Sequence, residues 1–169
     1  MMLVALYNCK ILLSLFFVMN KFILSLAFLA VSSISSTALA DCSINYAASS
    51  IITTEIKKRK FDFDGYDKLC ARLKANNAGV MLTGMTQISP YQTTASLSIA
   101  LYPVGEKYQG VTSNTDDWIR YEEERTSQAE VDTMYGLVMT ALDKLSQPEK
   151  EAKLKSMLQE VIEMRRATK

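Results

Sequence analysis

The sequence predicts a small α+β domain in which a helical hairpin precedes a three-stranded antiparallel meander and two C-terminal helices follow it, in the order α-α-β-β-β-α-α. Two observations predict this class. Residues 95–102 alternate between apolar side chains and small or polar ones, as in a strand with one buried face. Before and after the strands, apolar residues recur at the spacing of amphipathic helices. Because we find no internal repeat, we expect residues 41–169 to form a single domain.

The two helices of the hairpin are expected near the start of this domain. Residues 44–58 carry one apolar stripe, and the basic residues 57–60 suit a helix C-terminus, where cations meet the negative end of the helix dipole. The β-branched run 51–54 leaves a partly strand-like or broken helix open as the alternative. Asp64 is placed to cap the second helix, and residues 76–79 supply its stop.

The strands and the last two helices follow in order. Residues 79–88 and 95–102 are expected to form two strands joined by a turn, and residues 118–124 the third strand. Residues 127–130 have the pattern of a capping box and open the helix with the longest apolar stripe. Residues 146–149 repeat this pattern before the final helix.

Residues 1–40 are expected to be a signal peptide. A polar pair that contains a lysine at 20–21 precedes a short apolar segment at 22–31, and an A-x-A cleavage motif at 38–40 stands directly before Asp41. The mature chain would then begin at Asp41 and work outside the cytoplasm, in the periplasm or as a secreted protein.

Three alternatives for this end of the chain stay open. Met19 is one candidate for the true first residue. If residues 1–40 were retained, they would act as a membrane anchor. A membrane span needs about 20 predominantly apolar residues, however, and Lys10 and residues 20–21 divide this segment into shorter pieces. Cys42 stands where a bacterial lipoprotein carries its lipid, although Asp41 replaces the Gly, Ala or Ser of that pattern.

The mature chain keeps two cysteines, Cys42 and Cys70, which allow one intramolecular pairing. We expect a disulfide, because an exported protein meets an oxidising compartment; two separate buried thiols are the alternative. The bond would stabilise the fold by about 3–4 kcal/mol through loop closure. A plain antiparallel helical hairpin would hold the two cysteines too far apart, so the first helix must be shorter or bent, or the two helices must cross steeply.

The composition removes several classes of function. The chain contains no histidine, and so lacks both the Ser-His-Asp and Cys-His arrangements and the commonest zinc ligand. Of the 19 lysines and arginines, two lie in residues 1–40, which leaves 17 against 18 acidic residues in the mature chain. Nucleic-acid binding therefore has no electrostatic support. We expect no cofactor, and no stable membrane span once the signal has been removed.

Two groups of carboxylates are the candidates for catalysis or metal binding. Asp62, Asp64 and Asp67 alternate beside a glycine as in a calcium loop, but the glycine stands at the fourth position of the loop instead of the sixth. Helix capping explains these aspartates equally well. The second group, at 116–117 and 122–124, could supply a general acid and base, whereas such runs are usually solvated surface.

A partner surface is expected around Trp118, Arg120 and Tyr121. Trp118 is the one tryptophan of the chain and is flanked by charged residues, and Trp, Tyr and Arg dominate binding hot spots. The alternative is that Trp118 covers one side of the core. As part of a strand, Tyr121 would face the side opposite Trp118 and Arg120.

These observations together predict a non-enzymatic exported protein that binds another protein of the cell envelope. Its order of elements is similar to that of several small envelope-assembly and inhibitor proteins of Gram-negative bacteria, which is a likeness of architecture alone. An accessory or assembly factor and an inhibitor or immunity protein are both consistent with the sequence. The alternatives are a carboxylate-dependent cell-wall hydrolase and a calcium-binding protein.

Overall fold

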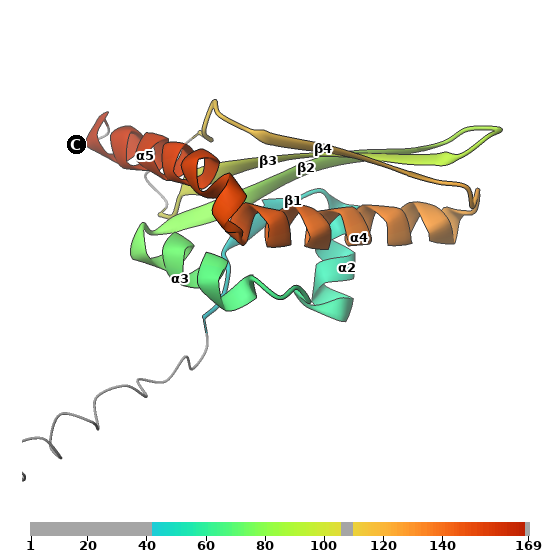
Figure 1. Ribbon diagram of the computed structural model, residues 1–169, viewed down its shortest axis with the longest axis horizontal. Helices are drawn as coiled ribbons and strands as arrows, with labels where there is room; N and C mark the ends of the chain where they lie inside the picture. Colours follow the sequence, from blue (N-terminus) through green and yellow to red (C-terminus); the bar gives the residue numbers. More distant parts are fainter. Residues whose placement is uncertain (1–41, 106–109, 168–169) are drawn as a thin grey trace, which may run out of the picture. The chain divides into compact units, whose positions relative to one another are not determined.

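A four-stranded sheet with the strand order β1-β2-β3-β4 is the centre of the fold (Figure 1). The computed structural model describes residues 42–105 and 110–167, and within these ranges it has four α-helices and the one sheet. The predicted α+β class is therefore confirmed, although the sheet has one strand more than expected. The predicted signal peptide, residues 1–40, lies outside the described residues.

The first element is a strand and not the start of a helix. β1 (Tyr46–Ala48) pairs in parallel with Val80 to Leu82, and α2 (Ser50–Arg59) begins only after it. The prediction of a helix over 44–58 is wrong for its first part, since Ile44, Tyr46 and Ala48 also fit the period of a strand, and the edge of the sheet offers them backbone partners. Of the geometries that the two cysteines allowed, the structure has the shorter helix.

The predicted disulfide is confirmed. Cys42 and Cys70 are bonded, with their Cα atoms 5.9 Å apart. Cys70 lies on α3 (Tyr66–Ala75) and is buried, and the Tyr66 hydroxyl donates a hydrogen bond of 2.9 Å to the Cys42 carbonyl. The bond ties the start of the described chain to the core. It is compatible with an oxidising compartment.

Three long strands form the rest of the sheet. β2 (Ala78–Ile88) and β3 (Thr93–Pro103) pair along their full length as a hairpin, and β4 (Asp116–Glu122) adds antiparallel to β3. The predicted meander is confirmed, with its third strand beginning and ending two residues earlier than the expected range 118–124.

The two C-terminal helices are confirmed as elements, but their predicted caps are wrong. α4 (Ser127–Ser146) is capped by Thr126, whose hydroxyl accepts a hydrogen bond from the Ala129 amide. Glu130, expected to close a capping box with Ser127, instead accepts a hydrogen bond from Thr86. A short 3-10 turn, η1 (Pro148–Lys150), separates α4 from α5 (Glu151–Ala167).

The second predicted capping box, 146–149, is wrong as well. Ser146 is the buried last residue of α4, and its hydroxyl donates to the Asp143 carbonyl one turn back. Close packing fixes this end of α4, since a Cβ added at Gly65, which precedes α3, would lie 1.8 Å from the Ser146 hydroxyl oxygen. The Gly65 amide also donates to the Asp143 carboxylate, at 2.9 Å.

All four helices pack on one face of the sheet. The buried cluster joins side chains of α2, α3, α4 and α5 to strand residues of a single alternation, and Figure 1 shows α2, α3 and α4 on the same side of the strands. The strand members of this cluster are Val80, Leu82, Ala95, Leu97, Ile99 and Leu101. In the described part of the chain, no helix combines the length and the apolar character needed to cross a membrane.

Candidate functional site

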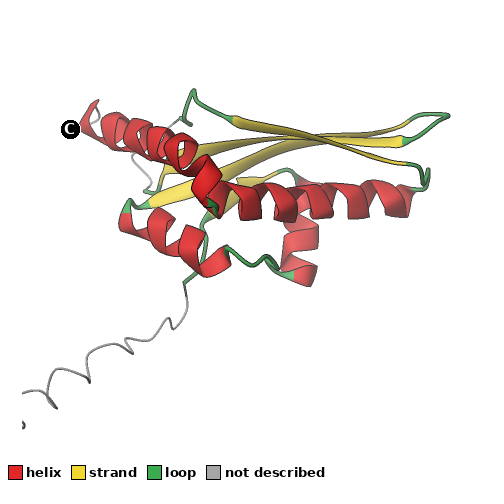
Figure 2. Cartoon of the chain, viewed as in Figure 1, coloured by secondary structure: helices red, strands yellow, loops and turns green. Residues whose placement is uncertain are grey.

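The opposite face of the sheet, called the open face below, is the candidate functional site. Figure 2 shows α2, α3 and α4 on the other side of the strands. The residues that alternate with the core positions form the open face, and Asp117 is the one charged residue among them. The open face consists of Ala47 from β1; Gly79, Met81, Thr83, Met85 and Gln87 from β2; Thr94, Ser96, Ser98, Ala100 and Tyr102 from β3; and Asp117, Ile119 and Tyr121 from β4.

Large apolar side chains stand exposed on the open face. Met85 is 73% exposed, Ile119 61% and Tyr121 59%. The strand register places Met85, Ser96 and Ile119 in one row across β2, β3 and β4. Isolated exposed apolar residues are common, but a contiguous group on one face indicates an interaction site.

The central strand forms the floor of a shallow trough on this face. Its outward residues from Thr94 to Ala100 are small, whereas Met81 and Met85 stand on one side of them and Ile119 and Tyr121 on the other. Over the floor, Thr83, Met85, Ser96, Ser98 and Asp117 line a depression of about 300 Å³. Hydroxyl groups and thioethers can hold a protein side chain there by contact and hydrogen bonding.

The sequence pattern of β3 explains why the helices of residues 42–105 and 110–167 pack on the other face. Leu97, Ile99 and Leu101 bury one side of the strand against α4 and α5, whereas Ser96 and Ser98, which alternate with these residues, cannot add to an apolar core. The predicted division of this strand into one buried face and one face of small or wet residues is confirmed.

The three residues predicted as a partner surface do not share one face. Tyr121 lies on the open face beside Ile119, whereas Trp118 and Arg120 alternate to the helix side of β4. Trp118 is half-buried and packs against the core, and its indole N–H donates a hydrogen bond of 2.8 Å to Asp116. Arg120 forms an exposed ion pair with Glu122, at 2.7 Å.

Asp116 is buried and held by two partners. Besides the Trp118 indole, Lys150 Nζ lies 2.7 Å from the Asp116 carboxylate and 5.1 Å from the centroid of the Trp118 ring. The three side chains connect β4 to η1, between the two C-terminal helices. Since the charge of Asp116 is neutralised by this pairing, we assign the cluster a structural role.

Met85 and Ile119 are exposed members of the candidate site that lie outside the predicted partner surface of Trp118, Arg120 and Tyr121. The place of Met85 in the row with Ile119 depends on the register of two strand pairs, which only the structure shows. The period-2 alternation of residues 79–88 would have placed Met85 on one face, but it does not say what lies beside it.

Most of the carboxylates considered for catalysis or metal binding are exposed. Within residues 42–105 and 110–167, no group of three metal-ligating side chains is placed to hold a metal ion, and Asp62, Asp64 and Asp67 are all exposed. Glu122, Glu124 and Asp132 do line a notch of about 150 Å³ between β4 and α4. Hydrogen bonds from Gln128 and Arg59 lower the pKa of Asp132, which is the opposite of what a general acid requires.

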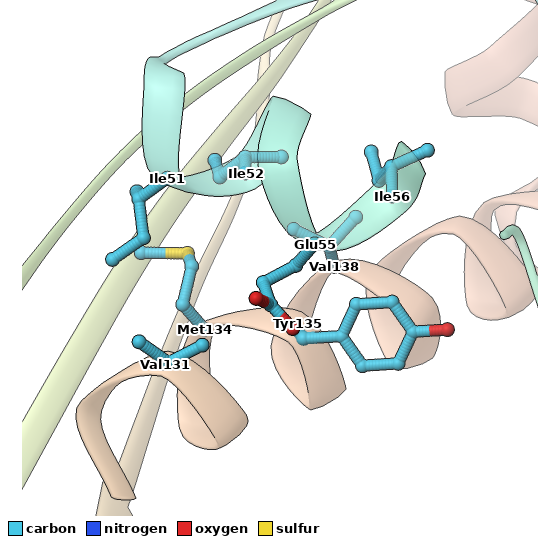
Figure 3. A pocket seen from close by; sticks show the side chains of 8 residues that line it. All are labelled: Ile51, Ile52, Glu55, Ile56, Val131, Met134, Tyr135 and Val138. Carbon is cyan, nitrogen blue, oxygen red and sulfur yellow. The ribbon is translucent and has the colours of Figure 1, made fainter. Parts of the chain in front are cut away.

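A tight gap between α2 and α4 is closed to ligands. Figure 3 shows Ile51 and Ile56 of α2 above Val131, Met134 and Tyr135 of α4. The space between the helices has no room for a water molecule.

One carboxylate, that of Glu55, borders this gap. It is 2.7 Å from Arg59 Nε, and the Arg59 guanidinium also contacts Asp132 and lies 4.9 Å from the centroid of the Tyr135 ring. These contacts hold α2 on α4, which is a packing role.

Comparison with protein-family models, with curated proteins and with solved structures gives no match for this chain.

Proposed function

We propose that this protein is an exported, non-enzymatic binding factor that recognises another protein of the cell envelope through the open face. The observation that carries the proposal is the group of exposed apolar side chains, Met85, Ile119 and Tyr121, around a trough of small uncharged residues. The core of a protein interface is depleted in charged residues and enriched in Met and Tyr. The open face has both features, in a chain of which 22% of the residues are charged.

Export is supported by two independent features. The leader pattern of residues 1–40 precedes a cleavage motif, and the Cys42–Cys70 disulfide suits an oxidising compartment. Within this function, an accessory or assembly factor and an inhibitor or immunity protein remain two forms of the same proposal. The neighbouring genes discriminate between them, since an immunity protein is expected beside the gene of its toxin.

We prefer a binding function to a hydrolase activity because of the environments of the carboxylates. A glycan hydrolase needs one carboxyl group that stays protonated near neutral pH. Here Asp116 is paired with Lys150, and the pKa of Asp132 is lowered. The lowered pKa keeps Asp132 ionised, and the Asp116 carboxylate is already held by Lys150 and by the Trp118 indole.

The test is recovery of a partner from an envelope extract with the wild-type protein and two variants. In the first variant, Met85→Lys and Ile119→Lys add two charges to the open face. In the control, Gln159→Lys adds a charge at an exposed position of α5. We expect the wild type and the control to recover the same partner and the open-face variant to lose it. Equal recovery by all three proteins, or by none, would show that the open face does not bind an envelope protein.

A further inference from the structure

We propose that an extended segment of a partner protein, with basic side chains alternating with apolar ones, binds the free edge of β4 as an additional strand. The inference rests on the proposed function in taking the neighbouring open face as a protein-binding surface, and it names the conformation and the chemistry of the segment that binds. It follows from the backbone of β4, from the charges along this strand and from the notch on its helix side.

β4 is an edge strand. It stands at the end of the strand order, and residues 42–105 and 110–167 place no strand beyond it. The hydrogen bonds of β3 show which of its residues bond which neighbour. On the β2 side, the Val104 amide donates to the Asn77 carbonyl, whereas Leu101 bonds Thr112, which leads into β4, through both its carbonyl and its amide. Even-numbered residues of β3 therefore bond β2, and odd-numbered residues bond β4.

The same alternation determines which backbone groups of β4 point outward. Leu97 is an odd-numbered residue and pairs with Trp118, so the even-numbered residues of β4 turn their N–H and C=O groups to β3. Asp117, Ile119 and Tyr121 turn theirs to the free edge, and the described part of the chain offers them no strand there. Such a row of N–H and C=O groups is a template for another strand.

β4 lacks three devices that commonly keep an edge strand from pairing, which are a lysine, a proline and a β-bulge. Residues 116–122 contain neither lysine nor proline, and the register with β3 continues without a bulge from Asp116 to Glu122. The side chains of Ile119 and Tyr121 are 61% and 59% exposed. The edge is therefore accessible to an added strand.

The charges along this edge favour a basic partner. Residues 116–124 contain five acidic residues and one basic residue, Arg120. Lys150 pairs with Asp116, and Arg120 pairs with Glu122. The carboxylates that have no ion pair within the described residues are those of Asp117, Glu123 and Glu124. Because like charges opposite each other destabilise a strand pair, a second copy of β4 is a poor partner and a strand with lysine or arginine is a good one.

The notch on the helix side of β4 offers a place for the basic side chains. Successive side chains of an added strand point to opposite faces of the sheet. Those on the open-face side lie next to Ile119 and Tyr121, which offer apolar contact. Those on the helix side lie next to the notch of about 150 Å³, where Glu124 can pair with an ammonium or guanidinium group. A sequence that alternates basic and apolar residues therefore fits both sides.

NMR titration with a peptide tests the inference, on protein expressed from the full-length gene. The probe is a heptapeptide of alternating lysine and valine with blocked ends, which matches the 7 residues of β4. We expect the amide proton resonances of Asp117, Ile119 and Tyr121 to shift as new hydrogen bonds form, and those of Trp118 and Arg120 to shift much less. A heptapeptide of alternating glutamate and valine should not bind. No shift at millimolar lysine–valine peptide, or equal shifts with both peptides, would overturn the inference.

Methylation of the peptide backbone tests whether the peptide binds as a strand. In an antiparallel arrangement the valine amides face β4, and in a parallel arrangement the lysine amides do. N-methylation of the amides that face β4 removes their hydrogen bonds, whereas methylation of the other set leaves the shared edge intact. We expect one set of methyl groups to abolish binding and the other to preserve it. Equal binding of the two methylated peptides, or loss of binding in both, would show that the peptide does not pair with the edge.

A pair of variants with the same net charge tests the role of the notch. Glu124→Lys reverses a charge that lines the notch, and Glu163→Lys reverses one at an exposed position of α5. Glu124→Lys should weaken the binding of the lysine–valine peptide by about fivefold or more, since an attraction becomes a repulsion. Glu163→Lys should bind the peptide as the wild type does. Equal weakening by the two variants would reduce the effect to net charge and would contradict the site.

The outcomes separate this inference from the proposed function. An envelope protein that is recovered through the open face, with no peptide binding at β4, would remove the edge site and keep the function. Peptide binding at the edge, with no envelope protein recovered, would keep the edge site and remove the function. A wild type whose β4 amide resonances shift on dilution would assign the edge to a second copy of the chain and would overturn the inference.

Discussion

The ion pair between Arg72 and Glu151 shows how single side chains join helices that are distant in sequence. The terminal nitrogens Nη1 and Nη2 of Arg72, on α3, donate to the carboxylate of Glu151, the first residue of α5. The hydrogen bond from Arg72 holds the pKa of Glu151 below its ordinary value. Because the pKa is lowered in the folded state, the pair stabilises the fold above the pKa of the unfolded chain, and this contribution is lost as the pH falls through the folded pKa.

Arg72→Gln should therefore raise the pKa of Glu151 toward its ordinary value, which carboxyl NMR titration can measure. The stability difference between this variant and the wild type should be small, since the pair is exposed, and it should disappear at acid pH. Lys74→Gln removes a charge from the same helix and should leave the pKa of Glu151 nearly unchanged. A Glu151 titration that is the same in both variants would show that the Arg72 hydrogen bond is not the cause.

At the scale of elements, the N-terminus of α4 offers a direct comparison of two adjacent hydroxyl residues. Thr126 accepts a hydrogen bond from the Ala129 amide, whereas Ser127 is already inside the helix. Thr126→Ala should lower the free energy of unfolding by about 1 kcal/mol, and Ser127→Ala by no more than a few tenths. Urea denaturation measures both values. A larger loss of stability for Ser127→Ala would show that Ser127 caps the helix, as the predicted capping box requires.

The elements also show which parts of the fold a sequence can predict. β3 and α4 were predictable, because each buries one face along many residues and its period is therefore unambiguous. β1 was missed because three residues have no distinctive period, and its strand conformation depends on pairing with Val80 to Leu82. The exact cap of α4 was missed because Thr126 and Ser127 are both good N-cap residues.

The candidate site was predictable only in part for the same reason. Alternation alone separates Tyr121 and Ile119 from Trp118 and Arg120, so the sidedness of β4 follows from the sequence. The contribution of Met85 depends on long-range register, which the turn between β2 and β3 sets.

For the whole molecule, the disulfide is the strongest single constraint. Cys42 and Cys70 are 28 residues apart, and closing a loop of this size in the unfolded chain is worth about 3–4 kcal/mol. Cys42→Ser should therefore lower the free energy of unfolding by about 2–4 kcal/mol in a denaturant titration. With reductant present, the wild type should approach the variant.

A thiol titration provides the control for this prediction. A chain of residues 41–169, purified from an oxidising compartment and then denatured, should contain no free thiol. Two titratable thiols per chain would contradict the bond and would reopen the reading of Cys42 as a lipid attachment site.

The parallel pairing of β1 also has a consequence for the order in which the chain folds. The ribosome makes β1 first, but its partner strand β2 follows only after α2 and α3. β1 therefore cannot pair until β2 has been made. The β2–β3 hairpin has local contacts and can form within microseconds, whereas β1 closes a much longer loop. Everything from β2 onward can thus assemble before β1 docks on the edge of the sheet. The docking of β1 would then be a late step of folding.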